Sequence, residues 1–287
     1  SNTTASNNTG IGFGALVANT TGTSNTAVGA YALDANTTGD TNTALGQNAL
    51  GANTTGNGNV AIGYQALIKN TTANYNVAIG ENSQFAHLTG TNNVAVGAYS
   101  LDANESSSNN TAIGDSSLTS STAGQNTALG YASLTNLTTG TYNIGIGYNA
   151  NSSAVDSSGQ CTLGDGQISN LRCNDTSISS LSDSRDKTDV INSPYGLEFI
   201  NTVRPVQFKW ETRDGNVKDG STRIGFLAQE LLSATDGNNA ILDLVHDDNP
   251  DKLEAKYGNL LPILVKAIQE LSAQNAELTT RITTLEG

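Results

Sequence analysis

A short polar segment, S-L-S-D-S-R-D-K at residues 180–187, brings together side chains that could do chemistry. It holds Ser182, Asp183, Arg185 and Lys187 within six positions. A serine hydroxyl becomes a useful nucleophile when a neighbouring base takes its proton, and a lysine amine can be that base. Taken alone, a serine and a lysine five positions apart are more typical of a solvated linker with scattered charges. The meaning of the segment therefore depends on the elements that would position it.

The sequence that follows predicts a small α+β core. Residues 194–230 contain an expected helix from Tyr195 to Val203, a break at Pro205, a strand V-Q-F-K-W, a turn at Asp214-Gly215 and a second strand T-R-I-G-F-L-A. Trp210 and three of the five phenylalanines fall in this stretch. Large apolar side chains at this density can support a compact core.

The last segment of the chain predicts a helix that needs partner helices. Apolar residues and one asparagine follow the 4-3 spacing of a coiled coil: Leu261, Leu264, Ile268, Leu271, Asn275, Leu278, Ile282 and Leu285. With Leu261 at position a, leucine fills every d position, a choice that favours dimers. The repeats described next favour three chains instead, and the two indications conflict. A core-facing asparagine such as Asn275 is expected to fix register rather than bind a ligand.

Upstream, a phrase ending in A-(I/V/L)-G recurs with a period of 17 and one step of 16. Its closing glycines are Gly12, Gly29, Gly46, Gly63, Gly80, Gly97, Gly114, Gly130, Gly147 and Gly164. A fixed period of this kind is typical of a solenoid, in which one unit buries its apolar face against its neighbours. We expect two short strands in each copy, a bend near the glycine and a turn at N-T-T-G.

Each copy offers few residues to a core. The inward candidates are single aliphatic residues (Val28, Leu45, Ile62, Ile79 and Val96), joined by alanines and by Leu33, Leu50, Leu67 and Leu101. Ordering one residue costs about 1–2 kcal/mol of backbone entropy, against about 25 cal/mol for each Å² of apolar surface buried. We therefore expect three parallel chains around one axis, so that each rung buries its Val or Ile against two copies of itself.

The N-(T/V)-A-(I/V)-G phrase resembles the head repeats of trimeric autotransporter adhesins and the related repeats of phage tail-fibre proteins. This resemblance implies a trimeric left-handed parallel β-roll.

A second resemblance covers about residues 180–272. S-D-S-R-D-K is followed, in order, by G-L-E-F-I, R-P-V-Q-F-K-W, I-G-F-L-A-Q-E and Y-G-N-L-L-P-I-L-V-K-A-I-Q-E-L. The series closely resembles the endosialidase-type intramolecular chaperone, which ends many phage tail spikes and fibres and occurs in some membrane-tethered transcription factors. The resemblance implies a module that trimerises, helps the preceding β-rod to fold and then cuts itself off at the serine of S-D-x-R-x-K.

Carried over to this chain, the resemblance makes Ser182 the nucleophile, Lys187 its partner and Leu181–Ser182 the scissile bond. Asp183 and Arg185 match the motif as supporting residues without an assigned role. The only histidines, His87 and His246, lie far from the motif in sequence. A Ser-Lys dyad is therefore the economical arrangement, since it needs no Ser-His-Asp triad.

The chemistry is consistent with that assignment. The Oγ of Ser182 lies one residue beyond the carbonyl of Leu181, so its attack closes a five-membered ring without diffusion. Cleavage would pass through an ester that water hydrolyses. A lysine with the ordinary pKa of about 10.4 must lose its proton to act as a base, and burial favours the neutral form. We expect burial in an assembled trimer to supply this, which would make cleavage a checkpoint on assembly.

Charge and composition exclude several classes of partner. The net charge is −13, and 12 of the 13 basic residues follow residue 150, which argues against nucleic acid and anionic membrane as partners. The sequence has no 18-residue apolar run, no signal peptide and no initiating Met, so we expect an excerpt from a longer soluble protein with no membrane insertion. Cys161 and Cys173 are too few for a disulfide framework and lack companions for a zinc site. We expect plain thiols, no metal and no cofactor.

A glycan-degrading enzyme finds little support in the rod. Glycoside hydrolysis needs a close pair of carboxylates, and residues up to 150 offer six acids: Asp34, Asp40, Glu81, Asp102, Glu105 and Asp115. Asp34 and Asp102 occupy equivalent places in their repeats, which indicates solvation of the rim rather than catalysis.

The sequence thus predicts a mainly β rod at 1–168, a Ser-rich linker at 169–181, an α+β chaperone at 182–258 and a trimeric coiled coil at 259–287. The expected function is the distal part of a homotrimeric phage tail fibre on the virion, binding an unknown host-surface receptor for which a glycan is one candidate. The alternative is an adhesin on a bacterial cell surface, with a permanently attached trimerisation domain and an inert Ser-Lys pair.

Overall fold

The structure is a computed structural model that describes residues 4–168, 171–172, 182–211 and 220–286. The chain forms two compact units, Ser1–Ile168 and Ser169–Gly287.

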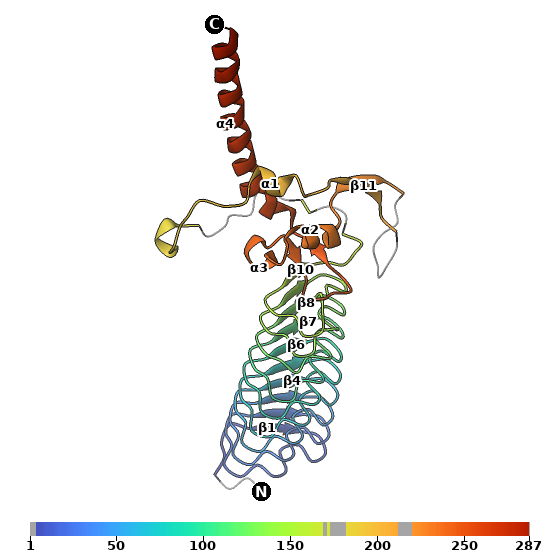
Figure 1. Ribbon diagram of the computed structural model, residues 1–287. Helices are drawn as coiled ribbons and strands as arrows, with labels where there is room; N and C mark the ends of the chain where they lie inside the picture. Colours follow the sequence, from blue (N-terminus) through green and yellow to red (C-terminus); the bar gives the residue numbers. More distant parts are fainter. Residues whose placement is uncertain (1–3, 169–170, 173–181, 212–219, 287) are drawn as a thin grey trace. The chain divides into compact units, whose positions relative to one another are not determined.

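The first unit is a β-solenoid of about nine turns, in which each repeat contributes one strand of three residues. The ten strands form one parallel sheet in chain order and lie stacked along the solenoid (Figure 1). Equivalent residues of successive repeats pair with each other, as in Ala27 with Ala44 and Ala44 with Ala61. The strands are β1 (Thr9–Ile11), β2 (Thr26–Val28), β3 (Thr43–Leu45), β4 (Val60–Ile62), β5 (Val77–Ile79), β6 (Val94–Val96), β7 (Thr111–Ile113), β8 (Thr127–Leu129), β9 (Ile144–Ile146) and β10 (Cys161–Leu163).

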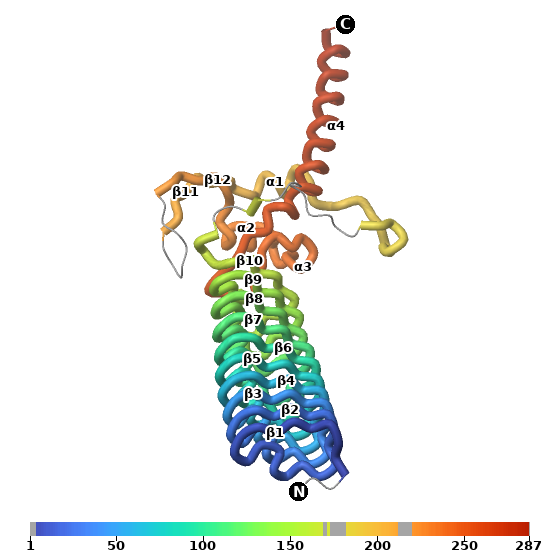
Figure 2. The backbone as a smooth tube through the Cα atoms, turned by 180° about the vertical axis from the view of Figure 1, so that it is seen from behind, coloured from blue at the N-terminus to red at the C-terminus, as the bar shows by residue number. Residues whose placement is uncertain are grey.

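The prediction of a second strand in each repeat is wrong. The Y-A-L phrase after the glycine forms turns, in which Tyr31 and Leu33 adopt left-handed φ angles of 57° and 49°. Alternation of left-handed residues curls the chain instead of extending it, and each repeat closes into one coil (Figure 2). The curl directs Leu33 into the interior, where it is fully buried.

The inward candidates divide into two groups. The leucines after the turn (Leu33, Leu50, Leu67 and Leu101) are fully buried, as expected, and so are the central alanines of strands β2 to β8. Val28, Leu45, Ile62, Ile79 and Val96 are not inside the solenoid, since they are half-buried or, for Leu45, 46% exposed. Side chains alternate across a strand, so the residue next to a buried alanine points out of the coil. These residues form an apolar column on the outer face of the sheet.

The glycine that closes each phrase is required because the backbone of the next rung lies where a side chain would begin. Gly63 has a φ of +134°, and a Cβ built on it would lie 2.5 Å from the carbonyl oxygen of Gly80 in the next rung. Gly46 meets Gly63 in the same way, at 2.4 Å. The rungs can approach only where no side chain intervenes, which accounts for the period seen in the sequence.

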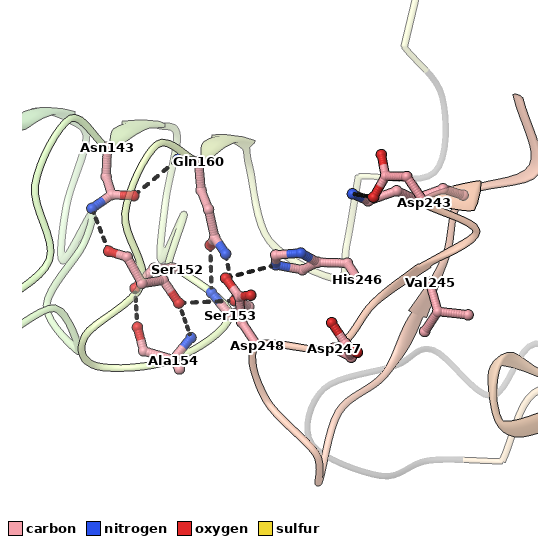
Figure 3. Close-up of polar contacts among 12 residues, drawn as sticks. Asn143, Ser152, Ser153, Ala154, Gln160, Asp243, Val245, His246, Asp247 and Asp248 are labelled. Atoms are coloured by element: carbon pink, nitrogen blue, oxygen red, sulfur yellow. Dashed lines mark hydrogen bonds and ion pairs between the residues drawn. The ribbon is translucent and has the colours of Figure 1, made fainter. Parts of the chain in front are cut away.

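Buried asparagines bond the rungs to one another. Asn42 precedes β3, and its backbone N–H donates to Asn25 Oδ1 of the previous rung at 2.9 Å. Its side chain donates to the Gly56 carbonyl of the next rung at 2.8 Å. This series extends to Asn143, whose Oδ1 accepts from the Gln160 backbone (Figure 3). A second series joins the N-T-T asparagines, as Asn36 donates to Asn19 Oδ1 at 2.9 Å.

The second unit is a small α+β region followed by a long helix. Its elements are a 3-10 turn η1 (Ser184–Asp186), α1 (Leu197–Ile200), β11 (Val206–Lys209), β12 (Thr222–Gly225), α2 (Ala228–Ala234), α3 (Asn239–Leu242), β13 (Val245–His246), β14 (Glu254–Ala255), η2 (Tyr257–Asn259) and α4 (Leu260–Glu286). Strands β11 and β12 pair antiparallel, and so do β13 and β14.

The core of the second unit differs in detail from the expectation. It consists of Phe199, Leu231, Leu242, Leu244, Val245, Leu260 and Ile263. Trp210 is 45% exposed and packs edge-on against Phe208 instead of joining this core. The first helix, α1, is shorter than expected, and the second strand ends at Gly225, after which α2 begins at Ala228. The expected turn at Asp214-Gly215 lies outside the described residues.

Helix α4 carries two apolar faces. Leu260, Ile263 and Ala267 are buried against the second unit. The residues of the 4-3 series are exposed instead: Leu261, Leu264, Ile268, Leu271, Leu278, Ile282 and Leu285 are 41–86% accessible. A helix with this stripe could form a coiled coil. Within the described residues, no helix combines the length and apolarity that crossing a membrane requires.

Candidate active site

The polar segment forms one tight turn. Asp183 is extended, with φ −67° and ψ 134°, and caps η1 by accepting from the Arg185 backbone N–H at 2.9 Å. The Asp186 N–H donates to the Asp183 carbonyl at 3.2 Å, and the Lys187 N–H to the Ser184 carbonyl at 3.3 Å. Aspartate at this position satisfies a backbone donor that the short helix leaves without a partner.

An ion pair closes the same turn. Arg185 Nη2 lies 2.6 Å from Asp183 Oδ2, and Arg185 Nε lies 3.0 Å from Asp183 Oδ1. The hydrogen bonds from the Arg185 side chain, followed by the one from its backbone, lower the pKa of Asp183 below its ordinary value. The carboxylate in turn raises the pKa of Arg185. Both side chains therefore stay charged at neutral pH.

The turn returns the lysine to the serine. Lys187 Nζ donates to Ser182 Oγ at 2.5 Å and lies 3.5 Å from the Ser182 carbonyl oxygen. All residues from Ser182 to Val190 are exposed to solvent. The structure thus brings Ser182, Asp183, Arg185 and Lys187 together in one exposed turn, while Leu181, the other side of the expected scissile bond, lies outside the described residues.

Neither histidine joins this turn through any contact among the described residues. His87 is buried in the solenoid, where its ring nitrogens face the carbonyls of Gly90 and Asn104. His246 lies in β13, and its Nε2 is 3.6 Å from Asp248 Oδ2 (Figure 3). The described part of the chain contains no group of three His, Cys, Asp or Glu side chains suited to a metal ion. Cys161 is a free, exposed thiol in β10, and Cys173 lies outside the described residues.

The motifs after the turn contact one another in pairs. Arg204 of R-P-V forms an ion pair with Glu230 of A-Q-E. The ring of Tyr257 packs edge-on against Phe226, and its hydroxyl lies 3.3 Å from both the N–H and the carbonyl oxygen of Phe226. A Cβ on Gly225 would lie 2.8 Å from that hydroxyl. Motifs that follow one another along the chain thus contact each other within one small fold.

One contact of this kind was missed by the sequence interpretation. Glu270 of α4 accepts the Leu197 N–H at the start of α1 through Oε2, at 2.7 Å. A Cβ on Gly196 would lie 2.4 Å from the same oxygen, so the glycine makes room for the carboxylate. This bond lowers the pKa of Glu270. Leu197 and Glu270 are 73 positions apart. In the sequence, only their places in the G-L-E-F-I and Q-E-L motifs point to them.

The acids of the rod do not form a catalytic pair among the contacts of the described residues. Burial raises the pKa of Asp34 and of Asp102, which occupy equivalent places in their repeats. Asp40 Oδ1 accepts from the backbone and the hydroxyl of Thr23 at 2.6 and 2.9 Å. Asp40 therefore joins rungs, in line with a structural role.

Comparison with protein families identifies the region that contains the turn. Residues 182–238, about a fifth of the chain, match the family described as chaperone of endosialidase, Peptidase_S74. The family itself is a self-cleaving chaperone domain of peptidase-like type. Searches among curated proteins and among solved structures returned no significant match.

The match begins at Ser182 and ends before β13. Together with the β-solenoid, it fits a tail fibre with a C-terminal chaperone domain. The combination supports a trimeric, tail-fibre-like protein.

Proposed function

We propose that this chain is the distal part of a trimeric phage tail fibre, attached to the virion and directed at a host-surface receptor. In this proposal residues 182–287 of the second unit trimerise, assist folding of the rod and then separate by autoproteolysis at Leu181–Ser182. The observation that carries the proposal is the 2.5 Å approach of Lys187 Nζ to Ser182 Oγ at the first residue of the chaperone match.

The proposed reaction uses groups of this chain and one water. Neutral Lys187 accepts the Ser182 Oγ proton while Oγ attacks the Leu181 carbonyl carbon, forming a C–O bond. The C–N bond to Ser182 then breaks, and the lysine returns the proton to the departing amine. Water hydrolyses the resulting ester, which leaves a carboxylate on Leu181 and restores the hydroxyl. Each protein molecule performs one turnover.

Lysine must be neutral for the first step, whereas an exposed ammonium is strongly hydrated. Lys187 is exposed in the single chain, so the proposal requires assembly to remove water from around it. Cleavage then reports that three chains have assembled.

Two apolar surfaces support assembly with further copies. The outer face of the solenoid sheet carries an aliphatic residue in every rung, and α4 exposes its 4-3 stripe. The outer column is Ile11, Val28, Leu45, Ile62, Ile79, Val96, Ile113, Leu129, Ile146 and Leu163. Parallel sheets are normally covered on both faces. Three copies in register would cover both surfaces with the same symmetry.

The test compares freshly expressed wild type with Ser182→Ala and Lys187→Arg by denaturing electrophoresis, intact mass and light scattering. We expect two fragments that meet at Leu181–Ser182 in the wild type and an uncut trimer in both variants, because arginine keeps the charge and does not act as a base. Ser184→Ala is the matched control, since Ser184 lies in the same turn and its hydroxyl has no hydrogen bond among the described residues. A wild-type chain that stays intact while trimeric would favour the fixed trimerisation domain of an adhesin.

A further inference from the structure

Asp183 holds the turn through two kinds of contact at once. Its carboxylate accepts the Arg185 backbone N–H, and it also forms a two-point ion pair with the guanidinium of the same residue. Among the described residues, the partners of its carboxylate lie within two positions along the chain. The contacts of the carboxylate therefore involve no other described element of the fold.

The turn determines where the lysine lies. With Asp183 as the cap, the chain makes one 3-10 turn over Ser184–Asp186 and becomes extended again at Lys187, at φ −121°. This change of direction sends the Lys187 side chain back to Ser182 Oγ. A chain extended from residue 182 to 187 would separate the two residues by about 3.3 Å for each position.

We propose that Asp183 and Arg185 are positioning residues that assemble the Ser182–Lys187 pair inside a single chain, before any partner is bound. This inference rests on the proposed self-cleavage. It divides the requirements of the reaction: the turn supplies the geometry, and assembly supplies the burial. A single chain thus carries a lysine that is correctly placed but exposed to water.

The expected loss of cleavage rate is large because one carboxylate, that of Asp183, makes both contacts that hold the turn. Exposed ion pairs contribute little to stability by themselves. Asp183, however, provides both the cap and the ion pair, so its removal frees Lys187 from Ser182. Small displacements of a reacting group can slow a reaction by about a hundredfold, and we expect Asp183→Ala to slow cleavage at least about tenfold.

The experiment measures first-order cleavage of the full chain by intact mass, with the trimer followed by light scattering. Asp183→Ala should cleave slowest, because it removes both the cap and the ion pair. Asp183→Asn and Arg185→Ala should cleave at intermediate rates, because asparagine can still cap the helix and Arg185→Ala keeps the Asp183 cap. Asp186→Ala and Asp186→Asn are the matched controls, since that carboxylate is exposed in the same turn and has no partner among the described residues. Both controls should cleave at the wild-type rate, and all variants should remain trimeric.

A double-variant cycle separates positioning from direct catalysis. Asp183→Asn and Arg185→Ala remove the same ion pair, so together they should slow cleavage no more than the slower single variant. An Asp183→Ala chain that cleaves at the wild-type rate would overturn the proposal, and so would loss of its trimer. Arg185→Ala much slower than Asp183→Ala would overturn it as well, since the guanidinium would then act on the reacting carbonyl itself. A wild-type trimer that stays uncut would contradict the proposed self-cleavage itself. That outcome is distinct from a failure of the positioning role of Asp183 and Arg185.

Discussion

Two series of asparagine side chains lie inside the solenoid, where they bond neighbouring rungs. Asn25, Asn36, Asn42 and Asn53 are fully buried, and their side-chain amides donate hydrogen bonds. Buried polar groups of this kind are costly to leave without a partner. The frequency of asparagine in the sequence therefore reflects internal bonding, and the N-T-T triplets, which also match a glycosylation acceptor, place their asparagines out of reach of solvent.

His87 interrupts one asparagine series and predicts a pH dependence of rod stability. Loss of water lowers the pKa of His87 from its ordinary 6.5, despite the two carbonyls that face its ring. Folding therefore favours the neutral ring, so this contribution to stability is complete above about pH 6.5 and is lost as the pH falls from there toward the folded pKa.

The matched variant is His87→Asn, which restores the residue found at Asn70 and Asn104 in the same series. The thermal midpoints of both proteins, followed by circular dichroism between pH 7.5 and 5, should diverge as the pH falls, with the wild type becoming less stable. Parallel pH profiles would show that protonation of His87 does not oppose folding.

The glycine column makes a second prediction at the residue scale. Gly63→Ala requires a left-handed backbone and places a Cβ 2.5 Å from Gly80 O, so we expect a loss of more than about 1 kcal/mol. Gly51→Ala is the control, because its Cβ would approach no atom closer than 3.4 Å and its φ is not positive. Chemical denaturation should separate the two variants. Equal stability would mean that the rungs shift apart without cost.

At the scale of elements, the period in the sequence predicted the solenoid because every copy repeats the same local contacts. Gly12 to Gly147 share one conformation and one close neighbour, so spacing alone locates them. The same spacing could not show that Tyr31 and Leu33 are left-handed, because tyrosine and leucine rarely adopt that region. The spacing also could not show that, of the inward candidates, only the alanines and the leucines after the turn lie inside the solenoid, while Val28 and Leu45 face outward.

The second unit was less predictable because its contacts are remote in sequence. The helix α1 has only four residues, too few to be stable alone, and its first N–H is bonded by Glu270. No periodic pattern links Gly196 to Glu270. At the candidate site, by contrast, the approach of Lys187 to Ser182 is set within six residues. The motif alone did not single out this segment, which also needed the resemblance over residues 180–272.

The contact between α1 and α4 predicts that the long helix stabilises the segment after the turn. Glu270→Ala leaves the Leu197 N–H without its carboxylate, so we expect faster hydrogen exchange over Leu197–Ile200. The bonded carboxylate has a lowered pKa, so its contribution is present above the ordinary value of 4.5 and is lost as the pH falls through the folded pKa.

The control for this prediction is Glu277→Ala, which removes an exposed glutamate of α4 with no contact among the described residues. Exchange measured by mass spectrometry at pH 7 should rise in α1 for the first variant only. An unchanged α1 in Glu270→Ala would show that the packing of Phe199 is sufficient without the hydrogen bond.

At the scale of the whole molecule, repetition creates an ambiguity that the C-terminal unit can resolve. Identical rungs allow three rods to pair with a shift of one repeat, because every shifted rung meets an equivalent one. The stripe on α4 is not periodic with the rod, and Asn275 lies at one of its a positions, where a polar residue fixes register. If the α4 helices associate first, they would therefore align the three rods before the rods pack against one another.

The outer column of the sheet provides the corresponding test, since proposed trimerisation of the rod depends on it. Ile113 in β7 and Leu88 in a bend between strands are both 39% exposed. The same substitution can therefore be compared at equal accessibility on the sheet and away from it. Ile113→Glu would place three carboxylates at one level of the axis, where like charges in an apolar contact repel and lose hydration. We expect this variant to lose the trimer of the rod by light scattering and to cleave more slowly, whereas Leu88→Glu should behave as wild type. A trimer equally tolerant of both substitutions would show that the sheet faces solvent and that the chains associate through the C-terminal unit alone.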